Sequence, residues 1–133
     1  MPDTADEAAI RSLVETWAAA VRRRDLEAVM RHHTPDLLMF DVPPPFESRG
    51  LEAYRESWKV FYHWARDPVR FDIRSMDVVA GADVAVVMCA MQCAGTETSG
   101  KDIDLDFRLT LGLRKIDGQW AIFHEHHSIP AES

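Results

Sequence analysis

The stretch KDIDLDFRLTLGLRKIDGQWAIFHEHHSIP, residues 101–130, decides the fold of this chain. Its first half alternates apolar and polar residues, and the apolar side carries Ile103, Leu105, Phe107, Leu109, Leu111 and Leu113. A two-residue period of this length predicts a half-buried β-strand. Asp117-Gly118 supplies the positive-φ residues that a hairpin turn requires, so a second strand should return antiparallel over residues 119–129.

The second strand ends in His124-Glu125-His126-His127, a cluster of titratable groups at the end of a core strand. Glu125 and His127 share one face of the strand, and His124 and His126 share the other. The hairpin could have a two-residue turn or a three-residue turn with a bulged glycine, and the two turns would put opposite faces of the second strand toward the core. The turn alone therefore does not decide whether Glu125 and His127 or His124 and His126 face inward. The alternative for His124 and His126 is a zinc site, because some zinc sites use this strand spacing.

The remaining elements place helices first and long strands last. Apolar residues at helical spacing predict three helices, over residues 5–23, 26–33 and 51–65, and Thr4 with Glu7 matches a capping box. Three further strands are predicted over residues 37–42, 69–80 and 84–94, with a bulge near residues 75–76. This segregated order predicts a single domain, residues 1–133, of the α+β class, with the helices on one face of a curved antiparallel sheet.

The composition favours a cytoplasmic protein that binds neither nucleic acid nor membranes. A formal net charge of −7 disfavours polyanions and anionic lipid surfaces, and no apolar run is long enough for a membrane span. Cys89 and Cys93 lie four residues apart on one predicted strand, roughly 13 Å from each other, which is too far for a disulfide. Two buried free thiols are typical of a reducing compartment.

The strand predicted over residues 84–94 is apolar on both faces, since Val84, Val86 and Met88 alternate with Ala85 and Val87. Three helices can cover only one face of the sheet. A second copy of the chain is therefore the expected cover of the other face, which predicts a homodimer through the outer side of the sheet.

The chain resembles the nuclear transport factor 2-like superfamily, which includes ketosteroid isomerase, SnoaL-type polyketide cyclases and the association domain of calmodulin-dependent kinase II. The residues that carry this resemblance are Asp117-Gly118-Gln119-Trp120 with residues 124–130, and the interval from Phe40-Asp41 to Ser48-Arg49-Gly50. The resemblance implies a cystatin-like cone, in which a strongly bent sheet wraps around a long helix and a pocket lies at the open end. It also implies a dimer through the convex face of the sheet. Comparison with these relatives favours Phe123, Glu125 and His127 facing inward. The outward side would then form the dimer face, with Arg108, Trp120, Ile122, His124 and His126.

The resemblance also implies roles for individual residues. Asp41 occupies the place of the isomerase's proton-abstracting aspartate, and Trp58 that of an aromatic residue lining its pocket. Trp17 stands where the isomerase has an oxyanion-donating tyrosine, and Leu109-Thr110-Leu111 stands where a protonated aspartate is the second donor. The family's steroid isomerisation is therefore not expected.

Two hypotheses for function follow, with no cofactor or metal expected and a small apolar molecule as the expected ligand. In the first, the chain is an isomerase, cyclase or lyase for a small carbonyl compound, with Asp41 as base and His127, oriented by Glu125, as acid or oxyanion donor. In the second, it is a non-catalytic ligand-binding protein or a dimeric association module. Aromatic side chains are expected to bind the ligand, namely Trp17, Tyr54, Trp58, Phe61 and Phe123. His32 and His33 are expected to be solvated at a helix end.

Overall fold

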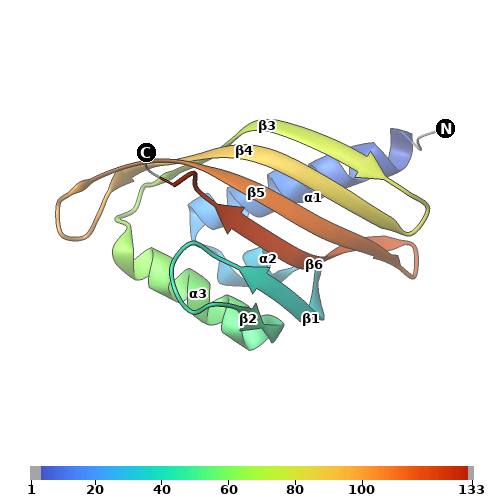
Figure 1. Ribbon diagram of the computed structural model, residues 1–133, viewed down its shortest axis with the longest axis horizontal. Helices are drawn as coiled ribbons and strands as arrows, with labels where there is room; N and C mark the ends of the chain where they lie inside the picture. Colours follow the sequence, from blue (N-terminus) through green and yellow to red (C-terminus); the bar gives the residue numbers. More distant parts are fainter. Residues whose placement is uncertain (1–3, 132–133) are drawn as a thin grey trace.

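The computed structural model describes residues 4–131, which form three helices and six strands (Figure 1). In chain order the elements are α1 (Thr4–Arg23), α2 (Leu26–Met30), β1 (His33–Phe40), β2 (Ser48–Arg49), α3 (Gly50–Trp64), β3 (Arg70–Ala80), β4 (Val84–Thr96), β5 (Asp102–Ile116) and β6 (Gln119–Ser128). The predicted helices and long strands are confirmed to within a few residues. The capping box predicted for Thr4 involves a side chain outside the described residues.

The strands form a six-stranded curved sheet in the order β2-β1-β6-β5-β4-β3. In Figure 1, α1 lies along one face of the sheet and α3 lies below it, beside β1 and β2. The apolar stripe of α1 is buried, and α1 packs against β3. The predicted α+β class and curved sheet are confirmed, but the sheet is mixed, because β1 runs parallel to β6. This crossover joins distant segments, so local sequence patterns do not encode its direction.

Of the two predicted turns, the β5–β6 hairpin has the two-residue one: Ile116 is paired with Gln119, and Asp117 and Gly118 have positive φ. The register then shifts between Gly112 and Leu113 of β5, where Phe123 of β6 is left as an unpaired extra residue. A bulge of this kind reverses which side chains face inward. Residues before the bulge and residues after it can therefore both face the core.

Because of this bulge, three residues face the opposite way from the prediction. Trp120 and Ile122 are buried in the core, so the prediction that they belong to a dimer face is wrong. Phe123 turns to the outer face, where the Arg114 guanidinium lies 4.3 Å from its ring centroid. Glu125 and His127 face inward as predicted, whereas His126 and Arg108 are exposed on the outer face.

The segment after α2 also differs from its prediction. α2 ends at Met30, and β1 begins at His33, whereas the sequence predicted a helix to residue 33 and a strand only from residue 37. Pro35 explains part of the difference, because proline disfavours helical backbone in the residue before it. The short strand β2 was not predicted, and it pairs with β1 through Leu38 and Arg49.

The outer face of the sheet carries exposed apolar side chains on its two neighbouring strands β3 and β4. Val79 of β3 is paired with Val86 of β4, and Val84 and Met88 are exposed on either side. The inward side chains of β4 are buried, including the thiols of Cys89 and Cys93, which are free as predicted. The described helices include none with the length and apolar content needed to cross a membrane.

Candidate functional site

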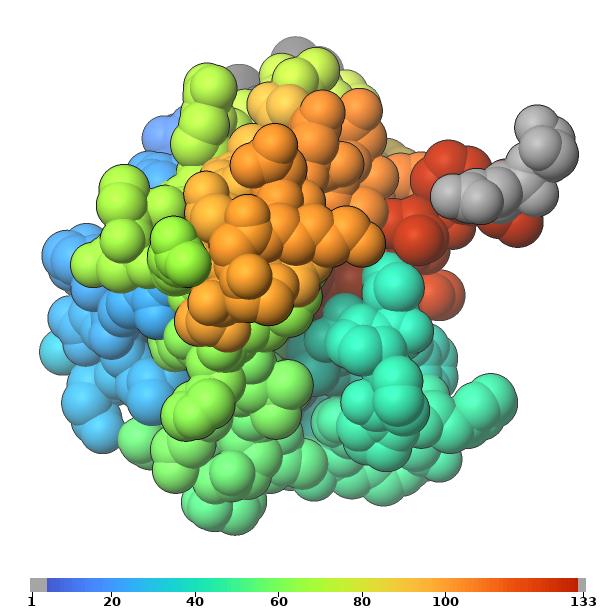
Figure 2. Space-filling model, turned by 90° about the vertical axis from the view of Figure 1, so that its left-hand side faces the viewer, coloured from blue at the N-terminus to red at the C-terminus, as the bar shows by residue number. Residues whose placement is uncertain are grey.

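A cavity of about 440 Å³ opens between α3 and the inner face of the sheet. Figure 2 faces this end of the molecule, where the loop after β1, α3 and the β4–β5 connection surround a depression. The cavity has an almost wholly apolar lining, formed by Met39, Asp41, Val42, Pro43, Ser57, Trp58, Val60, Phe61, Trp64, Phe71, Cys93, Leu105, Phe107 and His127.

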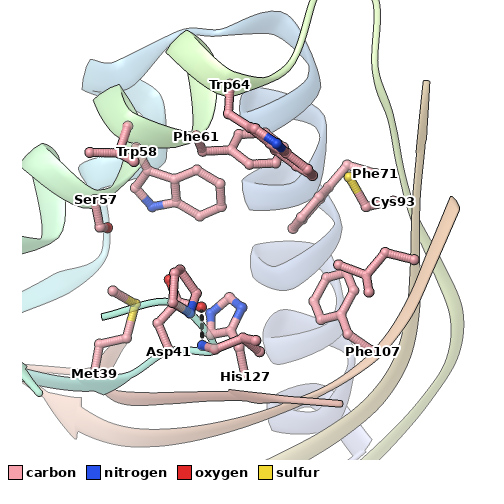
Figure 3. A pocket seen from close by; sticks show the side chains of 14 residues that line it. Met39, Asp41, Ser57, Trp58, Phe61, Trp64, Phe71, Cys93, Phe107 and His127 are labelled. Atoms are coloured by element: carbon pink, nitrogen blue, oxygen red, sulfur yellow. Dashed lines mark hydrogen bonds between the residues drawn. The ribbon is translucent and has the colours of Figure 1, made fainter. Parts of the chain in front are cut away.

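Asp41 and His127 lie together at one side of this cavity, facing Trp58 and Phe61 of α3 on the other (Figure 3). Asp41 directly follows β1, at the point where the prolines turn the chain out of the sheet. It is half-buried, and its Oδ1 accepts a hydrogen bond of 2.8 Å from the backbone N–H of Val42. Among residues 4–131, no side chain or backbone group hydrogen-bonds to its other carboxylate oxygen.

His127 is held by two contacts on the sheet side. Its ring lies parallel to that of Phe107, with an interplanar angle of 5° and centroids 5.9 Å apart. Its Nε2 lies 3.0 Å from Oε1 of Glu125, which is itself fully buried. Because these contacts fix the ring plane and occupy Nε2, Nδ1 is the ring nitrogen left for a ligand.

Glu125 is the centre of a buried polar network. Its Oε2 accepts a hydrogen bond of 2.5 Å from the Tyr54 hydroxyl and lies 2.7 Å from Nε2 of His33. The Tyr54 hydroxyl in turn accepts a hydrogen bond of 3.0 Å from Nε1 of Trp17. The network therefore joins α1, α3, β1 and β6 behind the cavity, and it satisfies each polar group that it buries.

His33 is the functional residue that the sequence reasoning missed. Its side chain is fully buried, so the prediction of a solvated His33 is wrong, while His32 is exposed as predicted. The parallel pairing of β1 with β6 brings His33 beside Glu125 across 92 positions of sequence. The Thr34-Pro35 pair could have indicated extended backbone here, but no local pattern indicates the partner.

The network shifts the acidity of its members. Burial favours the neutral form of Glu125, but hydrogen bonds from His127 and His33 and their charges outweigh it and lower the pKa of Glu125 to about 2. Burial also opposes the charging of His127, yet the Glu125 hydrogen bond and the charges of Glu125 and Asp41 raise the pKa of His127 above its ordinary value. Burial, with the neighbouring Glu125 charge, raises the pKa of Tyr54 well above 10.

The structure separates the predicted ligand-binding aromatic residues into two groups. Trp58 and Phe61 line the cavity. Trp17 and Tyr54 are not among its lining residues, because they are buried behind it in the network of Glu125. Phe123 lies on the opposite face of the sheet, so it cannot contact a ligand in this cavity.

The outer histidines do not assemble a metal site. His124 and His126 both pack against the edge of the Phe40 ring, and Nδ1 of His124 contacts the carbonyl oxygen of Leu38 at 2.7 Å. Within residues 4–131, no group of three or more His, Cys, Asp or Glu side chains is arranged to hold a metal ion.

The arrangement can perform acid–base chemistry on an apolar ligand. A carboxylate and an imidazole beside one largely apolar cavity can take a proton from one atom and supply a proton or hydrogen bond to another. The raised pKa of His127 favours its protonated form, which is the form that donates.

Comparisons with known proteins agree on one family. Residues 10–132 match the family described as the SnoaL-like domain. A solved structure of an NTF2-like protein of unknown function from Pseudomonas putida KT2440 is 31% identical, with a TM-score of 0.88 over 98% of this chain and 90% of that chain. No curated protein matches the chain.

Two further solved structures share the fold at lower identity. A ketosteroid isomerase-like protein from Erwinia carotovora atroseptica is 21% identical, with a TM-score of 0.80 over 94% of this chain and 96% of that chain. A putative calcium/calmodulin dependent protein kinase II association domain from Xanthomonas campestris is 23% identical, with a TM-score of 0.79 over 100% of this chain and 91% of that chain. The predicted resemblance to this superfamily is confirmed.

Proposed function

Because the chain belongs to the SnoaL-like domain family, we propose that it binds a small apolar carbonyl compound between α3 and the sheet and acts on it as an isomerase, cyclase or lyase. The observation that carries the proposal is the meeting of Asp41 and His127 on one otherwise apolar cavity. These two side chains come from separate segments, the end of β1 and the end of β6, which only the folded sheet brings together.

The lining favours an uncharged ligand. Asp41 and His127 are the only titratable lining residues apart from Cys93, and no lysine or arginine lines the cavity within the described part of the chain. A carboxylate or phosphate ligand would meet the Asp41 charge, and protonated His127, which could offset it, already lies beside Asp41. Burial raises the pKa of the Cys93 thiol to about 11, so this thiol is a poor nucleophile at neutral pH.

In this proposal Asp41 removes a proton from the carbon beside the carbonyl group. Protonated His127 donates a hydrogen bond or a proton to the carbonyl oxygen as negative charge develops there. Glu125 does not touch the ligand; it orients the His127 ring and keeps it protonated. Trp58 and Phe61 supply the apolar wall that holds the ligand against these groups.

The test is a panel of uncharged cyclic and aromatic ketones, ranked by thermal shift and then incubated with the protein in D₂O. NMR should show exchange of the hydrogens beside the carbonyl group. Asp41→Asn and His127→Gln should each slow exchange on the order of 100-fold or more while keeping the thermal shift.

Matched controls exist on the opposite face of the sheet. Asp106→Asn and His126→Gln change the same residue types at exposed positions away from the cavity, and they should exchange at the wild-type rate. If ketones stabilise the protein but exchange is absent, or if Asp41→Asn exchanges normally, the catalytic proposal fails.

A second candidate is a non-catalytic ligand-binding protein. One observation favours it: the Asp41 carboxylate already accepts a backbone hydrogen bond from Val42, as an ordinary turn-capping aspartate does. Binding of the ketone panel with equal thermal shifts in wild type and Asp41→Asn, without exchange in either, would support this candidate.

We also propose a homodimer through the outer face of the sheet, in the cytoplasm. The exposed apolar residues Val79, Val84, Val86 and Met88 support the dimer, because a neighbouring copy would remove them from water. His124, His126 and Arg108 border this face, but Trp120 and Ile122 belong to the core of a single chain. The two free buried thiols support a reducing compartment.

A further inference from the structure

The environment of His33 differs from that of the other buried histidine. Its Nδ1 lies 2.9 Å from the carbonyl oxygen of Arg31, and its Nε2 lies 2.7 Å from a carboxylate oxygen of Glu125. A carbonyl oxygen and a carboxylate can only accept hydrogen bonds. Both ring nitrogens of His33 therefore face acceptors, in a side chain with no exposed surface.

Two assignments of the proton between Glu125 and His33 keep both ring nitrogens of His33 hydrogen-bonded: the proton lies on Nε2 of His33, or on Oε2 of Glu125 with His33 neutral. Tyr54 donates to Oε2, and the Tyr54 oxygen is itself occupied by the indole N–H of Trp17. In the first assignment the Glu125 carboxylate accepts hydrogen bonds from Tyr54, His33 and His127, and these charge-assisted bonds are stronger than the neutral bonds of the second assignment. Beside an ionised Glu125, neutral His33 would direct a lone pair at the carboxylate or at the Arg31 carbonyl, a repulsive contact in a side chain that has no exposed surface.

We propose that His33 carries both ring protons and a positive charge, and that it is the positioning residue which keeps Glu125 a carboxylate and holds the His127 proton on Nε2. Glu125 and His33 then form a neutral buried pair. His127 gains or loses its second proton only at Nδ1, the nitrogen on the cavity side. Resting on the proposed function, this makes Nδ1 of His127 the atom that donates to the ligand.

The charge count explains what His33 contributes to the site. With His33 charged, the group of His33, Glu125, Asp41 and protonated His127 has no net charge. Without the His33 charge, Glu125 and Asp41 would face His127 alone, and the second proton on His127 would be held more tightly. The Tyr54 ring also packs beside His33, with the two ring centroids 4.6 Å apart. Tyr54 carries no charge at neutral pH, because its pKa is raised well above 10.

The test uses ligand-free, ¹⁵N-labelled protein, so it does not depend on turnover. Long-range ¹H–¹⁵N spectra of the imidazole rings should show protons on both nitrogens of His33 at about pH 7. For His127 in its neutral form they should show the proton on Nε2. His33→Gln retains a donor toward Glu125 but removes the charge, and it should raise the His127 titration midpoint on the order of one pH unit.

His126→Gln is the matched control, because it removes an exposed histidine from β6, the strand that carries His127. In this variant the His127 titration midpoint should not move. An unprotonated Nε2 on His33 in the wild type overturns the proposal, as does an unchanged or lower His127 midpoint in His33→Gln. The wild-type spectrum decides the matter if His33→Gln does not fold. The expected spectra without ketone exchange would leave the proton assignment standing and refute only the catalytic role.

Discussion

Replacing Glu125 by glutamine tests the buried network most directly. The substitution preserves the shape of the side chain but removes the negative charge to which His33, His127 and Tyr54 all hydrogen-bond. The new amide NH₂ group would face donors, and the positive charge that we propose for His33 would lose its counter-charge inside the core. Breaking a buried ion pair from one side typically costs about 3–5 kcal/mol, because the remaining charge stays buried.

For a domain of 133 residues this loss corresponds to a fall in Tm of about 11–18 °C. Urea unfolding followed by tryptophan fluorescence would measure the free energy of unfolding. Glu15→Gln, an exposed change on α1, is the control and should cost less than about 0.5 kcal/mol.

The difference in stability between wild type and Glu125→Gln should also depend on pH. The pKa of Glu125 is lowered from 4.5 to about 2 in the folded chain, so its stabilising contribution is present above the unfolded value and lost as the pH falls toward 2. The difference between wild type and Glu125→Gln should therefore shrink by about 2 kcal/mol between pH 5 and pH 3. A loss below about 1 kcal/mol at pH 7, or a difference that does not change in acid, would refute the reasoning.

Three other predictions concern separate parts of the molecule. The pKa of His127 is raised on folding, so its stabilisation should be present below pH 6.5 and be lost as the pH rises through the folded value; His127→Gln should remove this alkaline loss in urea titrations. Gly112→Ala would place a Cβ 2.9 Å from the Phe123 ring and should cost about 1–3 kcal/mol in the same assay, whereas a neutral result would mean that the ring moves freely. Val86→Glu puts a charge in the exposed apolar face and should convert a dimer to a monomer in light scattering; a wild-type monomer would exclude the proposed interface.

The bulge at Phe123 is a feature of the hairpin that the sequence pattern did not predict. Alternation along β5 and the Asp117-Gly118 turn were sufficient to predict the hairpin and the inward side of β5. They could not reveal the extra residue that turns Ile122 and Glu125 to the same side, because nothing in the local residue types marks a bulge. The resemblance predicted Glu125 and His127 inward correctly, yet it placed Trp120 and Ile122 on the wrong face.

The resemblance to the superfamily pointed to Asp41 and His127, which both line the cavity. By itself the sequence determined the α+β class and the order of helices and strands. Periodicity and turn chemistry act over a few residues, so a single sequence is enough to expose them. Only the tertiary structure decided that β1 runs parallel to β6 and that His33 pairs with Glu125. The physical reason is that such contacts join segments far apart in the chain, and their stabilisation depends on burial that only the completed fold supplies.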